Sequence, residues 1–201
     1  ESILKDFDGA GLSTRLDAFF NSINDVAANP SSYGERAALL SNARVLTDTF
    51  NMAATNISRD LVSINSQIEH KVDAINGLAA RIAGFNGQIS TIELSGTSAN
   101  DLRDKRDLLL EELAGIVDIN VTENDTGQVD VYIGGSFIVA ANKTSELTTA
   151  ADPRDPDSLS LMLNGGTINN RISGGSLKGD LEGEYDTNFI HAFNLNFVYR
   201  F

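Results

Sequence analysis

Residues 57–92 read ISRDLVSINSQIEHKVDAINGLAARIAGFNGQISTI, and this stretch decides the fold. Apolar side chains recur in it every three or four residues, and only Lys71 interrupts the series. The series is Ile57, Leu61, Ile64, Ile68, Ile75, Leu78, Ile82, Phe85, Ile89 and Ile92. A repeat of about 3.5 residues puts one narrow apolar stripe along a helix, and such a stripe is stable only when other helices cover it. At about 1.5 Å per residue the helix would span roughly 50 Å, which is more typical of a structural protein than of an enzyme.

Another helical pattern precedes this stretch. Residues 12–29 carry an apolar face and stop before Pro30. Ser31 and Ser32 can accept hydrogen bonds from the first free N–H groups of a following helix, which is predicted to run from about residue 34 to about residue 92. Because the connection is short, we expect the two helices to pack antiparallel.

A third helix is predicted over about residues 100–114, with Asn100 as its N-cap. It is expected to pack antiparallel to the long helix, because the loop between them is also short. Its first turns carry charges of both signs at Asp101, Arg103, Asp104, Lys105, Arg106 and Asp107. On a helix, opposite charges three or four residues apart form surface ion pairs worth about 0.2–0.5 kcal/mol each. The three aspartates share a face and could suggest a divalent-cation site, but the interleaved basic side chains favour a solvent-exposed, salt-bridged surface.

After Gly115 the period of the apolar residues changes from 3.6 to 2. Val129, Val131 and Ile133 alternate with more polar residues after the turn-forming segment 123–127, which predicts a β-hairpin. The expected fold class is therefore α+β. A long antiparallel α-helical coiled coil or bundle is followed by a small antiparallel β domain.

The predicted domain organisation follows from this change of period. Residues 1–115 form the α-helical coiled-coil domain and residues 116–188 form the antiparallel β domain, with the glycine-rich segment 174–183 as its exit. Residues 189–201 have apolar side chains at about every second position. They are predicted to be a divergent or non-native β-type tail, such as a fusion or a frame-shifted end, with an ordinary strand of the β domain as the alternative.

The composition excludes several classes of function. A formal net charge of −13 would repel phosphate backbones and anionic membrane surfaces, so neither nucleic acid nor a membrane is an expected partner. The chain has no Cys, which removes disulfides and thiolate metal sites. No apolar run approaches the ~20 residues of a membrane-spanning helix. The first residue is Glu1 rather than Met, which suggests a fragment or a processed product.

Residues that carry chemistry are few. The histidines are His70 and His191, too few for a histidine metal cluster, and His70 is interpreted as a solvent-exposed residue of the long helix. The glycine pairs at 134–135, 165–166 and 174–175 lack the strand-glycine-helix context and the Lys of a phosphate-binding loop. No catalytic, cofactor-binding or metal-binding residue is therefore predicted, and the chain is expected not to be an enzyme.

Several motifs together resemble one protein family. The two most specific are residues 75–89 (INGLAARIAGFNGQI) and residues 99–109 (ANDLRDKRDLL). Shorter matches are residues 11–13 (GLS), 35–40 (ERAALL) and 172–179 (ISGGSLKG). Over about residues 11–181 these stretches make the chain similar to the flagellar hook-associated protein 1 family, whose members join the hook of a bacterial flagellum to its filament.

The resemblance implies a secreted, extracellular structural protein of the flagellar axis, with no catalytic residue and no cofactor. It also implies that the terminal helices of the flagellar core lie outside this chain. The implied partners are other axial proteins, namely the hook, a second junction protein and filament subunits, together with copies of the chain itself. An export chaperone is a further candidate partner through the missing termini. Two alternatives stay open: a flagellin or other axial protein, and a surface-exposed binding or adhesion module.

Overall fold

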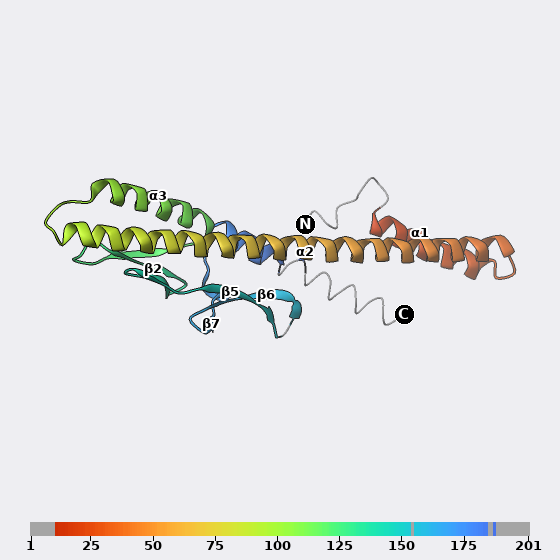
Figure 1. Cartoon of the computed structure of the whole chain (residues 1–201). Coiled ribbons are helices and arrows are strands. Elements are labelled where there is room, and N and C mark those ends of the chain that lie inside the picture. The colour runs from red at the N-terminus through yellow and green to blue at the C-terminus, as the bar shows by residue number, and fades with distance from the viewer. Residues whose placement is uncertain (1–10, 154, 185–186, 188–201) are drawn as a thin grey trace. The chain divides into compact units, whose positions relative to one another are not determined.

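The computed structural model describes residues 11–153, 155–184 and 187 (Figure 1). Its first three helices are α1 (Leu12–Ala28), α2 (Tyr33–Glu93) and α3 (Asn100–Ile116). The prediction of one continuous long helix is confirmed by α2. At its start, the backbone N–H of Glu35 donates to the hydroxyl of Ser32 at 3.3 Å, which is the predicted cap.

In the part of the chain that the structure describes, seven strands follow α3 and form two small antiparallel sheets. The first sheet has the order β1-β2-β3-β4 and the second the order β5-β6-β7. The strands of the first sheet are β1 (Asn120–Glu123), β2 (Val129–Ile133), β3 (Ser136–Ala140) and β4 (Lys143–Thr144). Those of the second are β5 (Leu147–Asp152), β6 (Asp155–Leu163) and β7 (Gly166–Thr167), and a short 3-10 helix, η1 (Asn169–Arg171), comes next. The predicted α+β class, with helices before small antiparallel sheets, is confirmed.

By packing, the described residues fall into two compact units, residues 11–60 and residues 61–187. This division lies inside α2 and not at the predicted domain boundary between residues 115 and 116. The predicted boundary stays a prediction about domain organisation. Each unit has its own internal contacts, and residues 189–201, with the predicted β-type tail, lie outside the described residues.

In residues 11–60, α1 and the first part of α2 form a helical hairpin. The two helices run antiparallel (Figure 1), and Asn42 Nδ2 donates to the carbonyl of Ala18 at 3.3 Å. Among the described residues of this unit, Ile57 alone is a fully buried apolar side chain. The other apolar side chains of the hairpin are half-buried or exposed. Within the described residues of this unit each helix packs against one other helix, and such a pair has too little interior to bury them.

In residues 61–187, the apolar stripe of α2 forms the centre of one core. Leu61, Ile68, Ile75, Leu78, Ile82 and Ile89 are buried as the periodicity predicts, and the four from Ile68 to Ile82 belong to this core. Val72 occupies the inner face beside the interruption at Lys71. The same core contains Leu109 and Leu113 of α3 together with apolar side chains of β2, β3, β5 and β6. The prediction that helices alone cover the stripe is therefore wrong, since the flat apolar faces of both sheets cover much of it.

Residues 176–184 are helical, so the predicted glycine-rich exit of the β domain forms a helix from residue 176. Leu177 and Leu181 enter the core. Lys71 Nζ pairs with Asp180 Oδ2 at 2.6 Å and donates to the carbonyl of Ser176 at 2.8 Å. The one charged residue in the apolar stripe thus fixes this helix to α2.

Candidate functional site

Three asparagines of α2 bind the backbone of the sheets. Asn76 Nδ2 donates to the carbonyl of Leu147 at 2.8 Å, and the N–H of Leu147 donates back to Asn76 Oδ1 at 2.9 Å. Asn65 Nδ2 donates to the carbonyl of Asp157 at 2.8 Å. A side-chain amide carries a donor and an acceptor, so it can pair with a strand edge as another strand would. These contacts fix where each sheet lies along α2.

Asn86 makes the most complete of these contacts and is fully buried. Its Nδ2 donates to the carbonyls of Val129 at 2.7 Å and Ala141 at 2.6 Å, and its Oδ1 accepts the N–H of Val129 at 3.1 Å. Ala141 has a φ of +52° in the turn between β3 and β4. Asp130 Oδ1 accepts its N–H at 2.6 Å. Side chains therefore bind both the N–H and the carbonyl of Ala141, the residue with this unusual φ.

A charged cluster joins the end of α2, α3 and β1. Arg103 pairs with Glu93 at 2.7 Å and with Glu123 at 2.6 Å. The hydrogen bond from Arg103 holds the pKa of Glu93 at about 2, and the two carboxylates raise the pKa of Arg103. The predicted pairing of Arg103 with charges three or four residues away on its own helix is wrong. Its partners come from other elements, ten residues before it and twenty after it in the chain.

Arg106, expected on the surface, is buried beside this cluster. Its Nη1 donates to the carbonyl of Gly127 at 2.7 Å, and its Nε lies 3.3 Å from Asp107 Oδ1. Gly127 has a φ of +72°, and a Cβ there would collide with the side chains of Glu93 and Arg103. The turn before β2 therefore packs tightly on both arginines of the motif at residues 99–109.

The charged cluster makes a prediction about acid stability. The folded pKa of Glu93, about 2, lies below the ordinary 4.5, so this carboxylate stabilises the fold fully above pH 4.5. That contribution is lost as the pH falls from 4.5 toward 2. We expect Glu93→Gln to flatten the pH dependence of the urea midpoint in this range. Glu112→Gln, at an exposed position of α3, is the control and should leave the slope unchanged. Equal slopes in the wild type and Glu93→Gln would contradict the pairing.

The chain enters and leaves the sheets at one place. Asp118, just after α3, accepts the N–H and the hydroxyl of Ser173 at 3.0 and 2.7 Å and the N–H of Gly174 at 3.2 Å. Burial opposes ionisation, but these hydrogen bonds together lower the pKa of Asp118. Gly175 follows with a φ of +82°, and a Cβ there would collide with the backbone of Ile116.

Gly175→Ala should destabilise the fold by about 2–3 kcal/mol, because it adds both a strained φ and a clash with rigid backbone. Gly179→Ala is the matched control. It lies in the helix at 176–184 with open space around its Cβ position, so it should stabilise the protein by about 0.5–1 kcal/mol. Urea unfolding followed by circular dichroism measures both changes. A Gly175→Ala midpoint equal to that of the wild type would show that the entry and exit segments do not pack this closely.

The residues considered for chemistry lie on the surface. His70, Asp101, Asp104 and Asp107 are exposed. Among the described residues, no group of three His, Cys, Asp or Glu side chains could hold a metal ion. The glycine pair at 134–135 forms a tight turn with positive φ at both residues, and the pair at 165–166 lies at the turn into β7. The absence of catalytic, cofactor and metal residues stays a prediction.

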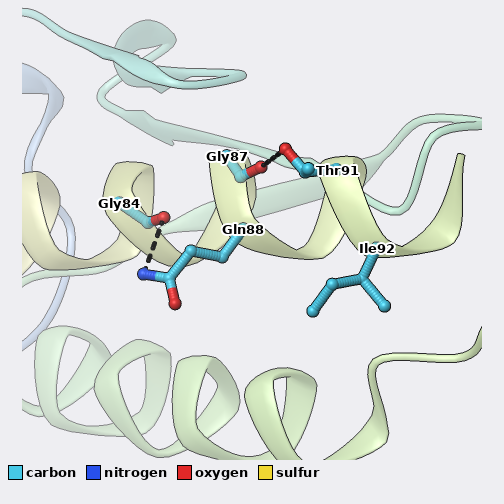
Figure 2. Close-up of a pocket in the computed structure, with 5 residues that line it drawn as sticks. All are labelled: Gly84, Gly87, Gln88, Thr91 and Ile92. Carbon is cyan, nitrogen blue, oxygen red and sulfur yellow. Dashed lines mark hydrogen bonds between the residues drawn. The ribbon is translucent and has the colours of Figure 1, made fainter. Parts of the chain in front are cut away.

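A shallow hollow of about 450 Å³ lies on α2 (Figure 2). Gly84, Gly87, Gln88, Thr91 and Ile92 line it. Figure 2 shows two of their side chains bonded to carbonyls one turn earlier, Thr91 to Gly87 at 2.8 Å and Gln88 to Gly84 at 3.4 Å. None of these five residues has an ionisable side chain, so the hollow itself offers no acid or base for catalysis.

The surface of residues 11–60 is the strongest candidate for a functional surface. It exposes large apolar side chains on both helices of the hairpin. They are Phe20, Ile23, Tyr33, Leu40, Val45 and Met52. Residues 11–60 carry four Arg and five Asp or Glu, whereas residues 61–184 carry nine Lys or Arg and nineteen Asp or Glu. The hairpin is thus nearly neutral and apolar, while the unit that holds the sheets is strongly acidic.

Within the described part of the chain, no helix has the length and hydropathy needed to cross a membrane.

Comparisons with known proteins point to one family. The model of the family described as "Flagellar hook-associated protein FlgK helical domain" matches residues 1–192. The flagellar hook-associated protein 1 of Escherichia coli is 28% identical over 164 residues, which cover 80% of this chain and 30% of that protein. That of Salmonella typhimurium is 30% identical over 150 residues, covering 73% of this chain and 27% of that protein.

A solved structure agrees with these matches. It is the flagellar hook junction protein FlgK from Burkholderia pseudomallei, with a TM-score of 0.77 and 30% sequence identity. The match covers 86% of this chain and 32% of that protein. The chain thus spans between a quarter and a third of the length of its relatives.

Proposed function

Because the chain belongs to the flagellar hook-associated protein FlgK helical domain family, we propose that it is part of a structural protein joining the hook of a bacterial flagellum to its filament. The proposed action is assembly, without catalysis or a cofactor. The structural observation that carries this proposal is the apolar, nearly neutral surface of residues 11–60.

The exposed apolar side chains of α2 lie on two different sides of the helix. Tyr33 and Leu40 are seven residues apart and share one side, and Val45 and Met52 share another. At about 100° per residue, Val45 is turned by roughly 140° from Leu40. Two separate apolar sides allow one neighbour on each side, as in a closed ring or a tube. This arrangement favours a repeating assembly over a simple two-fold dimer.

The energies support assembly through this surface. Full burial of a large apolar side chain contributes about 1.5–3 kcal/mol, so six such side chains can drive association even when each is buried only in part. The acidic unit has the opposite role in the proposal. Its excess of carboxylates keeps unassembled subunits apart and in solution, because like charges repel.

The proposed location is outside the cell, in the flagellum. The proposed partners are the hook, a second junction protein, filament subunits and copies of the chain itself. An export chaperone is proposed as a transient partner of parts of the full-length protein that lie outside this chain. Neither nucleic acid nor a membrane is a proposed partner, since the net charge of −13 opposes contact with anionic surfaces.

Deletion of the gene tests the proposed function. A strain that lacks it should still export filament subunits but release them into the medium, because the surface that retains the filament is missing. We expect non-motile cells with hooks and without filaments, and recovery of both filaments and swimming when the gene is restored. Normal filaments and swimming in the deletion strain would contradict the proposal and favour the binding-module alternative.

A further inference from the structure

Three Asn-Gly pairs occur in the chain, and the structure places them in different surroundings. Two of them, Asn76-Gly77 and Asn86-Gly87, lie within α2. The third, Asn164-Gly165, is the two-residue turn between β6 and β7 and is exposed. We propose that Asn164-Gly165 is a self-modification site, at which the asparagine is converted into aspartate or isoaspartate by reaction with its own backbone and water.

The reaction needs the backbone nitrogen of the residue after the asparagine to reach the side-chain carbon. At Asn164 that nitrogen belongs to Gly165, which has no side chain to block the approach. The nitrogen forms a bond with the side-chain carbonyl carbon of Asn164 and closes a cyclic imide. The bond from that carbon to Nδ2 breaks, and Nδ2 leaves as ammonia with the proton lost by the Gly165 nitrogen. Water then adds to either imide carbonyl and opens the ring to aspartate or isoaspartate.

The turn at Asn164 must open for this step, because its left-handed conformation holds the Gly165 nitrogen on the side away from the Asn164 side-chain carbon. Asn164 has a φ of +52° and Gly165 a φ of +77°, as in the two-residue turns favoured by hairpins. No heavy atom lies within 4 Å of the position that a Cβ of Gly165 would occupy. Asn164 Nδ2 donates to the carbonyl of Phe137 at 3.0 Å, and this exposed bond must open before the ring can close.

The two pairs in α2 are protected by the fold. The α-helical backbone holds the nitrogens of Gly77 and Gly87 in its hydrogen-bond ladder and away from the preceding side chains. Both asparagine side chains are also bonded at both ends, Asn76 to Leu147 and Asn86 to Val129 and Ala141. The same dipeptide is thus reactive in one place and protected in two others.

The modification would loosen the edge of the second sheet. Aspartate at position 164 has no side-chain N–H to donate to the carbonyl of Phe137, and isoaspartate adds a methylene to the backbone of a turn with only two residues. The strand after the turn, β7, has two residues, whose pairing with Met162 and Leu163 depends on that turn. The chain would therefore acquire a negative charge and a less ordered hairpin as it ages.

Peptide mapping by mass spectrometry tests this proposal on the full, folded chain kept for weeks in mildly alkaline buffer. We expect conversion at Asn164 to be several-fold faster than at Asn76 or Asn86, and the three rates to become similar in concentrated urea. Asn164→Gln, whose longer side chain closes this ring poorly, should remove the signal from its own peptide only. Equal rates at the three sites of the folded chain, or conversion at Asn164 only after unfolding, would overturn the proposal.

Discussion

Ile75→Asp is expected to destabilise residues 61–187 by about 4 kcal/mol or more and to prevent stable folding of that unit. Ile75 is fully buried at the centre of the core that α2 shares with α3 and both sheets. The substitution removes apolar packing and places a carboxylate in an apolar core, where it loses its hydration. Circular dichroism during urea unfolding should show loss of the cooperative transition.

Ala74→Asp is the matched control for this change. It adds the same side chain one residue earlier on α2, at an exposed position. Its effect should stay within about 0.5 kcal/mol, as for most surface substitutions. If the two variants unfolded at the same urea concentration, the apolar stripe would not be the centre of the core.

Asn86→Asp should have the second largest effect, a loss of about 3–5 kcal/mol. The two side chains have nearly the same shape, so packing is preserved. The change replaces the Nδ2 donor, bonded to the carbonyls of Val129 and Ala141, with an oxygen that faces two other oxygens. It also buries a charge without a partner. We expect a lower urea midpoint together with faster amide hydrogen exchange in β2 and in the turn between β3 and β4.

Gln88→Glu is the control that separates the loss of the Asn86 hydrogen bonds from the effect of adding a negative charge to α2. Gln88 is exposed on the same helix, two residues further on. The control should keep the wild-type midpoint to within about 0.5 kcal/mol. An Asn86→Asp variant as stable as this control would mean that the amide does not hold the first sheet on α2.

The long helix could be predicted from the sequence because its cause is local. Apolar residues three and four positions apart fall on one side of a helix whatever covers them. The covering elements could not be predicted in the same way. Ile82 and Ile89 show by their spacing that they are buried, but this spacing does not distinguish a neighbouring helix from a sheet. The structure shows both in contact with α2.

The polar contacts of the core were missed because their partners are distant in the chain. Asn76 bonds Leu147, 71 residues away, and Asn86 bonds Val129, 43 residues away. The sequence nevertheless indicated that Asn86 is buried. It lies four residues after Ile82 and three before Ile89, so it falls on the buried stripe. A polar side chain at such a position needs a buried partner.

The interpretation of residues 101–107 failed for a related reason. Their charges have the spacing of surface ion pairs, and the aspartates are indeed exposed. Arg106, however, is four residues after Leu102 and three before Leu109, which puts it on the apolar face of α3. There it meets the carbonyl of Gly127. The spacing of apolar residues shows that Arg106 lies on the inner face of α3, but it does not show that the carbonyl of Gly127 is the hydrogen-bond partner.

Thiol labelling of intact flagella tests whether assembly buries the exposed apolar surface of residues 11–60, since residues 1–201 contain no Cys. Met52→Cys in the full-length protein places one thiol on the exposed apolar surface of the hairpin, and Lys105→Cys places one on exposed α3. We expect a maleimide to react with both variants as isolated subunits, and assembly into flagella to protect the thiol of Met52→Cys much more than that of Lys105→Cys. Equal reaction of Met52→Cys before and after assembly, or absence of the protein from purified flagella, would contradict this expectation.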